Sequence, residues 1–155
     1  MSAVCGMDAI TIRAVANSDF DIWHPLWKSY QSFYSVEIPE SVTITNWERF
    51  LDPKEKLHAA IAVSGARALG LVHCVYHYST WTTDEYCYLQ DLYVAEGERS
   101  TGVGRALINY VYADAATRGT SRVYWLTHET NLAARALYDS VAERTGFIQY
   151  RKQLT

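Results

Sequence analysis

The feature that most constrains this sequence is a hydrophobic strand that runs into a Gly-x-Gly loop and then directly into an amphipathic helix. The strand covers residues 86–94, the loop covers residues 99–104, and the helix places Val103, Leu107 and Val111 on one face. This order aims several backbone N–H groups and the positive end of the helix dipole at one point. Gly102 and Gly104 lack a Cβ, so phosphate oxygens can approach the backbone closely. The segment predicts an anion cradle suited to a pyrophosphate.

Two common phosphate-binding motifs do not fit this loop. A dinucleotide fingerprint needs a small residue three positions after its second glycine, and that position is Leu107. A Walker loop needs Lys and Ser or Thr after its last glycine, and Gly104 is followed by Arg105 and Ala106. A plain left-handed turn that starts a helix stays open as the alternative, because Gly-x-Gly by itself is a weak signal.

The remaining patterns predict a single α/β domain over residues 1–155. Alternating or β-rich stretches predict strands at residues 9–15, 58–63, 68–78, 86–94, 122–126 and 146–154. Helical spacing predicts helices at residues 17–35, 44–51 and 131–142, besides the helix that begins at residue 103 and stops at Gly119. Adjacent strands joined by short gaps favour antiparallel hairpins. We therefore expect a mixed, largely antiparallel central sheet with helices on both faces.

Composition and charge exclude several classes of protein. The chain has 155 residues, of which 49% are hydrophobic and 20% charged, so it has the make-up of a globular domain. Its net charge of −3 provides no basic surface for nucleic acid. We see no secretory signal and no apolar run long enough for a membrane span, so no membrane partner is expected.

The three cysteines and the paired histidines do not predict a metal site. Cys5, Cys74 and Cys87 are an odd number without C-x-x-C spacing, which favours reduced core thiols in a cytoplasmic protein. His73 and His77 stand four apart in a predicted strand, about 13 Å along it, and this is too far for one metal ion.

Several motifs together resemble the GCN5-related N-acetyltransferase superfamily. Arg99-x-x-Gly102-x-Gly104, which follows a strand, resembles the coenzyme A loop of that family. Residues 131–138 (Asn-Leu-Ala-Ala-Arg-Ala-Leu-Tyr), followed by Gly146-Phe147, resemble its Asn…Tyr…Gly-Phe signature. The matching motifs span residues 89–154, and the stretch 137–152 further resembles a subgroup of histone and polyamine acetyltransferases.

The resemblance implies the acyl-CoA N-acyltransferase fold, with acetyl-CoA as cosubstrate and no metal. The backbone of residues 92–94 would pair with the pantetheine arm, and an N–H group of Tyr93 or Val94 would polarise the thioester carbonyl. The residues expected to bind the coenzyme are Leu92, Tyr93, Val94, Arg99, Ser100, Thr101, Gly102, Val103, Gly104, Arg105, Asn131 and Tyr138.

Tyr138 and Asp91 are the expected catalytic residues. Asn131 and Tyr138 stand seven apart and share one helix face, so one can contact the pantetheine arm while the other reaches the sulfur. A tyrosine with an ordinary pKa of about 10 stays protonated at neutral pH and can donate its proton to the leaving thiolate.

Asp91 stands in a strand with buried-looking neighbours, where a carboxylate is costly unless it is paired. It could act as the general base, anchor the substrate ammonium, or accept a structural hydrogen bond. Polyamine-type relatives carry a Glu-Asp pair here, whereas this chain has Gln90-Asp91. That difference weakens both the direct-base role and a polycationic acceptor. The reserve candidates for the base are Glu37, His73, Asp84 and Glu85.

These observations predict an N-acetyltransferase that moves an acetyl group directly to a primary amine. We expect a small-molecule acceptor (a polyamine or an amino acid) before a protein lysine, and a homodimer. An aromatic stripe of helical spacing, formed by Trp23, Trp27, Tyr30, Phe33 and Tyr34, is predicted to be mostly core, with its outer members lining the acceptor pocket. A catalytically silent sensor that binds coenzyme A or a nucleotide, or a plain interaction domain, are the alternative functions.

Overall fold

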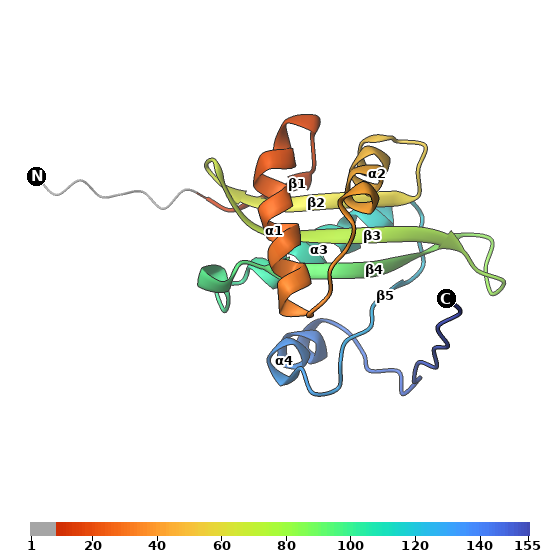
Figure 1. Ribbon diagram of the computed structural model, residues 1–155. Coiled ribbons are helices and arrows are strands. Elements are labelled where there is room, and N and C mark those ends of the chain that lie inside the picture. Colours follow the sequence, from red (N-terminus) through yellow and green to blue (C-terminus); the bar gives the residue numbers. More distant parts are fainter. Residues whose placement is uncertain (1–8) are drawn as a thin grey trace, which may run out of the picture. The chain divides into compact units, whose positions relative to one another are not determined.

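The computed structural model describes residues 9–155, so Cys5 lies outside the described residues. The chain forms two compact units, of which the first ends at Trp125 and the second is Leu126–Thr155. The first unit contains the sheet and three of the α-helices (Figure 1). Its elements are β1 (Thr11–Ala14), α1 (Phe20–Phe33), α2 (Glu40–Leu51), β2 (Leu57–Ser64), β3 (Arg67–Tyr78), β4 (Glu85–Val94), α3 (Val103–Thr117) and β5 (Val123–Tyr124). The second unit contains α4 (Leu132–Val141).

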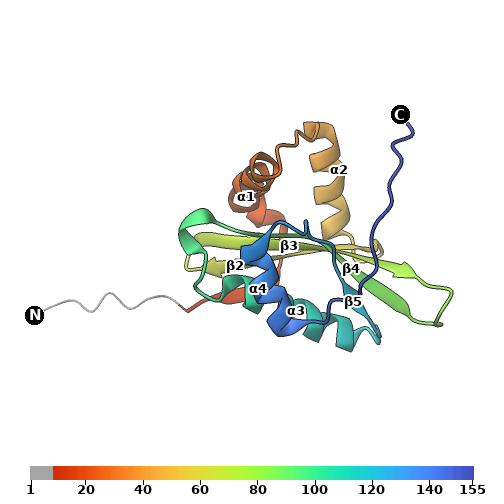
Figure 2. The ribbon, with the colours of Figure 1, turned by 90° about the horizontal axis from the view of Figure 1, so that it is seen from below.

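The five strands form one mixed sheet in the order β1-β2-β3-β4-β5, which confirms the expected fold class. The first three pairings are antiparallel, and β4 pairs with β5 in parallel. α1 and α2 cover one face of this sheet and α3 covers the other (Figure 2). The parallel step requires a crossover connection, and α3 provides it.

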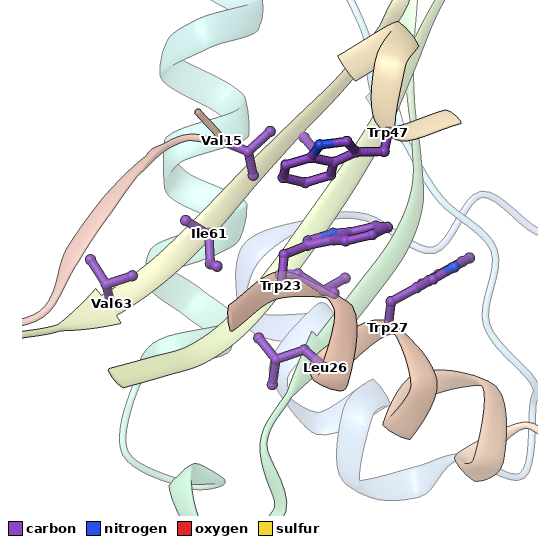
Figure 3. Close-up of a cluster of buried hydrophobic side chains, with 9 residues drawn as sticks. Val15, Trp23, Leu26, Trp27, Trp47, Ile61 and Val63 are labelled. Carbon is purple, nitrogen blue, oxygen red and sulfur yellow. The ribbon is translucent and has the colours of Figure 1, made fainter. Parts of the chain in front are cut away.

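A tryptophan-rich core lies between the sheet and the α1–α2 layer. Trp23 and Trp27 of α1 and Trp47 of α2 are all buried there, and the Trp23 and Trp47 rings lie 4.7 Å apart (Figure 3). Trp23 and Trp27 of the aromatic stripe are therefore core and Tyr30 packs against them, whereas Phe33 and Tyr34 are about half exposed, so less of the stripe is core than the helical spacing predicts. The sheet contributes alternate residues of β2 to this cluster: Ala59, Ile61 and Val63.

The opposite core lies under α3, as its helical spacing predicts. Val103, Leu107, Ile108, Val111 and Ala115 are all buried. The helix ends as expected at Gly119, which has a φ of +73°. The N–H groups of Gly119 and Thr120 donate to the carbonyls of Ala116 and Ala115, respectively. This pair of hydrogen bonds defines a Schellman motif.

Three sequence-based boundaries are wrong. α2 begins four residues earlier than expected, at Glu40, because Pro39 adopts an extended conformation before the first turn and leaves Glu40 free to be helical. β5 covers only Val123–Tyr124 of the expected strand. Residues 146–154 form no strand. A strand exists only where its backbone groups pair with a neighbour, and the sequence pattern does not reveal whether a neighbour is present.

No helix in residues 9–155 combines the length and apolar character of a membrane span.

Candidate active site

The predicted anion loop lies between β4 and α3. Gly102 occupies the N-cap position of α3 with a φ of +89°, a conformation in which glycine carries no Cβ penalty. No side chain caps the first turn of α3, so its backbone donors are presented without a competing carboxylate or hydroxyl acceptor at that position. Ser100 also has a positive φ of 63°, and the Thr101 hydroxyl donates to the Glu98 carbonyl at 2.5 Å. The loop therefore bends at Ser100 and again at Gly102, directly before the first turn of α3.

Arg99 lies against aromatic rings of two other segments. Its guanidinium stands 5.2 Å above the ring of Phe33 and 5.7 Å above that of Tyr93, and its Nε donates to the Val94 carbonyl at 3.3 Å. Because the side chain is exposed, the charge stays hydrated while the rings hold its position. Arg99 therefore connects the loop to the end of α1.

One edge of β4 is largely open within the first unit. β5 pairs only with Cys87 and Tyr88, so the described sheet has no strand beside residues 89–94 on that side. This is the stretch whose backbone was expected to pair with the pantetheine arm. The open edge leads directly to the loop before α3.

A β-bulge determines where Asp91 lies. Its Cα partner on β3 is His73, whereas the next pair is Cys74 with Leu89, so Gln90 is the extra residue. Strict alternation would place Leu89 and Asp91 on the same face. The bulge instead leaves Leu89 buried and turns Asp91 to the α1 side, where it meets His73 and Tyr30.

The Asp91 carboxylate accepts hydrogen bonds on both of its oxygens. The Tyr30 hydroxyl donates to Oδ1 at 2.6 Å, and His73 Nδ1 lies 3.0 Å from Oδ2. The Asp91 side chain keeps 12% of its surface exposed, whereas that of His73 keeps 6%. Burial and the nearby Asp91 charge raise the pKa of Tyr30 above its ordinary value, so this tyrosine stays protonated as a donor.

Further aromatic side chains surround this carboxylate on the exposed end of α1. The Tyr30 ring lies 4.8 Å from that of Tyr34 and 6.3 Å edge-on to that of Tyr93. Burial first, and then the Asp91 charge, raise the pKa of Tyr34. The Asp91 carboxylate therefore acts electrostatically on both Tyr30 and Tyr34. Phe33 and Tyr34 are about half exposed, at 52% and 46%. The carboxylate thus sits beside a partly exposed aromatic wall.

The reserve candidates for the base lie in other settings. Glu85 forms an ion pair with Lys56, and Glu37 and Asp84 are exposed. His73 is buried and bound to Asp91, a partnership that the sequence analysis did not predict. Only the cross-strand register could have revealed it, because the two residues are eighteen positions apart.

Asn131 and Tyr138 belong to the second unit. Asn131 stands at the N-cap position of α4, where its carbonyl accepts the N–H of Arg135 at 3.0 Å. Tyr138 is half-buried and lies two turns further along the same helix, as the spacing predicts. The other predicted site residues all lie in the first unit.

The thiols are core residues, as expected. Cys74 and Cys87 are free and buried, and the hydrogen bond to Cys87 together with burial raises the pKa of the Cys74 thiol. Within residues 9–155, no group of three or more His, Cys, Asp or Glu side chains is arranged to hold a metal ion.

The acetyltransferase (GNAT) family model matches residues 23–142. The chain belongs to this family. The family match spans the open β4 edge, the loop before α3 and α4. The chain is accordingly an acetyl-CoA-dependent N-acetyltransferase, which confirms the function inferred from the sequence.

Two GNAT relatives of known activity are similar in sequence. The D-amino-acid N-acetyltransferase HPA3 of Saccharomyces cerevisiae is 40% identical over 147 residues, which cover 94% of this chain and 91% of that protein. The thialysine N-epsilon-acetyltransferase of Caenorhabditis elegans is 34% identical over 85 residues, which cover 55% of this chain and 52% of that protein.

Solved structures share the fold. The aminoglycoside N-acetyltransferase AAC(6')-Iy in complex with CoA superposes with a TM-score of 0.83 at 18% identity, covering 98% of this chain and 99% of that chain. A probable acetyltransferase superposes with a TM-score of 0.82 at 23% identity, covering 94% of this chain and 98% of that chain.

Proposed function

We propose that this GNAT protein transfers the acetyl group of acetyl-CoA directly to the primary amine of a small molecule, with an amino acid as the first candidate. The observation that carries this proposal is the Asp91 carboxylate, fixed by two donors beside an aromatic wall and next to the open edge of β4. A carboxylate flanked by aromatic faces suits an ammonium group. The activity of HPA3 on D-amino acids supports an amino-acid acceptor.

The coenzyme would bind along the open edge of β4 and the loop before α3. The backbone of residues 92–94 would pair with the pantetheine arm, and the N–H groups of residues 99–105 with Arg99 would hold the pyrophosphate. Asn131 would contact the pantetheine arm from α4. Because the family match at residues 23–142 includes residues of both units, we propose that residues 1–155 act as one catalytic domain.

The transfer itself needs three proton movements. The acceptor arrives as an ammonium ion, and Asp91 receives its proton, directly or through water, so that the nitrogen lone pair is available. The nitrogen attacks the thioester carbonyl, whose developing negative charge is stabilised by an N–H group of Tyr93 or Val94. The C–S bond then breaks and Tyr138 donates its proton to the thiolate, while the nitrogen of the new amide gives up its extra proton, directly or through water, to the tyrosinate. No acyl-enzyme forms, in keeping with the buried Cys74 and Cys87.

We also propose a homodimer in the cytoplasm. Residues 143–155 follow α4 without regular structure and expose large apolar side chains that a partner would cover. These side chains are Phe147, Ile148, Tyr150 and Leu154. The reduced thiols favour a reducing compartment.

An amine panel tests the proposal. Thiol release from acetyl-CoA should be fastest with D- or L-amino acids, slower with polyamines, and slowest with a lysine peptide. Equal or higher kcat/KM for polyamines or for the peptide would contradict the amino-acid assignment. If none of the amines caused thiol release, the protein could at most bind acetyl-CoA. Calorimetry with acetyl-CoA separates that second case from a protein that fails to bind.

Asp91→Asn with Asp114→Asn as its matched control tests the base. Both carboxylates accept a tyrosine hydroxyl, Asp91 from Tyr30 at 2.6 Å and Asp114 from Tyr76 at 2.9 Å, but Asp114 lies on α3 at the other face of the sheet. Asp91→Asn should lower kcat/KM about 100-fold or more. Asp114→Asn should leave kcat/KM within about threefold. Similar losses in the two variants would mean that Asp91 acts only in folding.

A further inference from the structure

We propose that His73 is a positioning residue for the transfer, holding Asp91 ionised and oriented through a hydrogen-bond chain that begins at Trp23. This inference rests on the proposed role of Asp91. This hydrogen-bond chain runs from α1 through β3 to β4, so two other elements, α1 and β3, hold the carboxylate that β4 carries.

The first link sets the tautomer of His73. Trp23 Nε1 lies 3.0 Å from His73 Nε2, and both residues are buried. An indole N–H can only donate, so Nε2 must be the accepting, unprotonated nitrogen. His73 therefore carries its proton on Nδ1. The ring is neutral, and its one N–H is committed in a known direction.

The second link delivers that proton to Asp91. His73 Nδ1 lies 3.0 Å from Asp91 Oδ2, so Nδ1–H donates to the carboxylate. Because every donor in the chain points toward Asp91, the chain stabilises the charged form of the carboxyl group. The Tyr30 hydroxyl holds the other oxygen from α1. Donors on both oxygens prevent the carboxylate from rotating.

Packing keeps the imidazole in place. The Phe50 ring of α2 stacks on it at 4.6 Å, and the Trp27 ring meets it edge-on at 4.9 Å. A carboxylate oxygen has about two lone pairs, and each Asp91 oxygen uses one of them on a described donor. With 12% of the side chain exposed, Asp91 keeps acceptor capacity for a substrate ammonium.

Four titratable groups that interact with the Asp91 carboxylate stay neutral at acidic and neutral pH. α1 contributes two tyrosines, β3 a thiol and β4 another tyrosine, and each has a pKa raised by its surroundings, while α2 contributes the uncharged Phe50 ring. These four groups are Tyr30, Tyr34, Cys74 and Tyr88. These four groups should therefore not contribute to the acidic limb of a pH profile.

His73→Phe tests the chain because it keeps a ring of similar size and removes both nitrogens. The acidic limb of the kcat/KM profile should move to higher pH by about one unit, since losing a donor to a charged group makes the carboxylate easier to protonate. KM for acetyl-CoA should stay within about twofold. A limb that does not move in a variant that still binds acetyl-CoA would overturn the proposal.

His73→Asn provides the rescue, because its amide N–H can take the place of Nδ1–H. Its acidic limb should return toward that of the wild type. This variant decides the question if His73→Phe does not fold. An acidic limb of His73→Asn that lies a full pH unit above that of the wild type would show that hydrogen-bond donation from position 73 does not hold Asp91 ionised.

Trp23→Phe and Trp27→Phe form the matched pair for the first link. Both remove an indole N–H from α1, but the Trp27 N–H donates to the Thr43 hydroxyl at 3.2 Å and takes no part in the chain. Trp23→Phe should shift the limb upward and Trp27→Phe should not. Equal behaviour of the two would overturn the role of Trp23.

A spectroscopic readout separates this inference from the proposed function. The imidazole ¹⁵N shifts of His73 in the wild-type protein should be those of a neutral ring protonated on Nδ1. Protonation on Nε2 would overturn the proposed hydrogen-bond chain from Trp23 to Asp91, even if the enzyme were active. Conversely, the expected tautomer in a protein that acetylates no amine would leave the chain intact and refute the proposed function.

Discussion

Gly70→Ala should destabilise the protein, because the added Cβ on β3 would meet atoms of both β4 and α3. A Cβ at this position would lie 2.7 Å from the Tyr93 carbonyl oxygen, 3.2 Å from Leu107 Cδ1 and 3.4 Å from Val103 Cγ1. The first of these contacts is with backbone that is paired in the sheet, so no flexible side chain can swing away. Leu107 is fully buried and cannot retreat either.

The expected size of the effect follows from two opposing contributions. Overpacking a well-filled core costs about 1–3 kcal/mol. Replacing a strand glycine by alanine returns about 0.5–1 kcal/mol, because glycine loses more backbone entropy on folding. The close contact with backbone places the overpacking cost in the upper half of its range, about 2–3 kcal/mol, so the net loss in the free energy of unfolding should be about 1–2.5 kcal/mol. This corresponds to a melting temperature about 2–10 °C lower for a chain of this size.

Urea unfolding followed by tryptophan fluorescence measures this loss, and Gly97→Ala is the matched control. Gly97 has open space around its ideal Cβ, so that variant should change stability by less than about 0.5 kcal/mol. Because Val103 and Leu107 form the first turns of α3, displacing them should also weaken CoA binding in Gly70→Ala alone. Equal urea midpoints for Gly70→Ala and Gly97→Ala would refute the close approach of β3, β4 and α3.

Three further predictions concern the loop before α3, the proposed proton donor Tyr138, and the Arg13–Asp19 ion pair that precedes α1. Gly102→Val should raise the Kd for CoA about tenfold or more by calorimetry, because its φ of +89° is strained for a β-branched residue; an unchanged Kd would exclude this loop as the cradle. Tyr138→Phe should lower kcat about 100-fold while KM for acetyl-CoA stays within about threefold, and unchanged turnover would remove Tyr138 from the mechanism. Asp19→Asn should lose about 1–2 kcal/mol at pH 7, since the Arg13 guanidinium at 2.6 Å holds the pKa of Asp19 below its ordinary value. That carboxylate stabilises the fold above the unfolded pKa of about 4, so the gap between wild type and variant should close as the pH falls through the lowered folded pKa; a gap that persists at pH 2 would contradict the ion pair.

Local patterns in the sequence determined the elements and the family. The helical spacing at Val103, Leu107 and Val111 predicts α3, and alternation predicts β2, β3 and β4 to within one residue at each end. The loop motif at Arg99 and the glycines after it indicates the GNAT family. These signals are readable in one chain because they depend on neighbours a few positions apart.

The tertiary structure decided the setting of Asp91. The bulge at Gln90 reverses the face that alternation assigns to Asp91, and no local pattern announces it. The His73 and Tyr30 partners come from β3 and α1, eighteen and sixty-one positions away. Residues 146–154 show the same dependence, since a strand-like pattern does not form a strand without a partner. Strand pairing joins residues that are far apart in the sequence, so it is determined only when the chain folds.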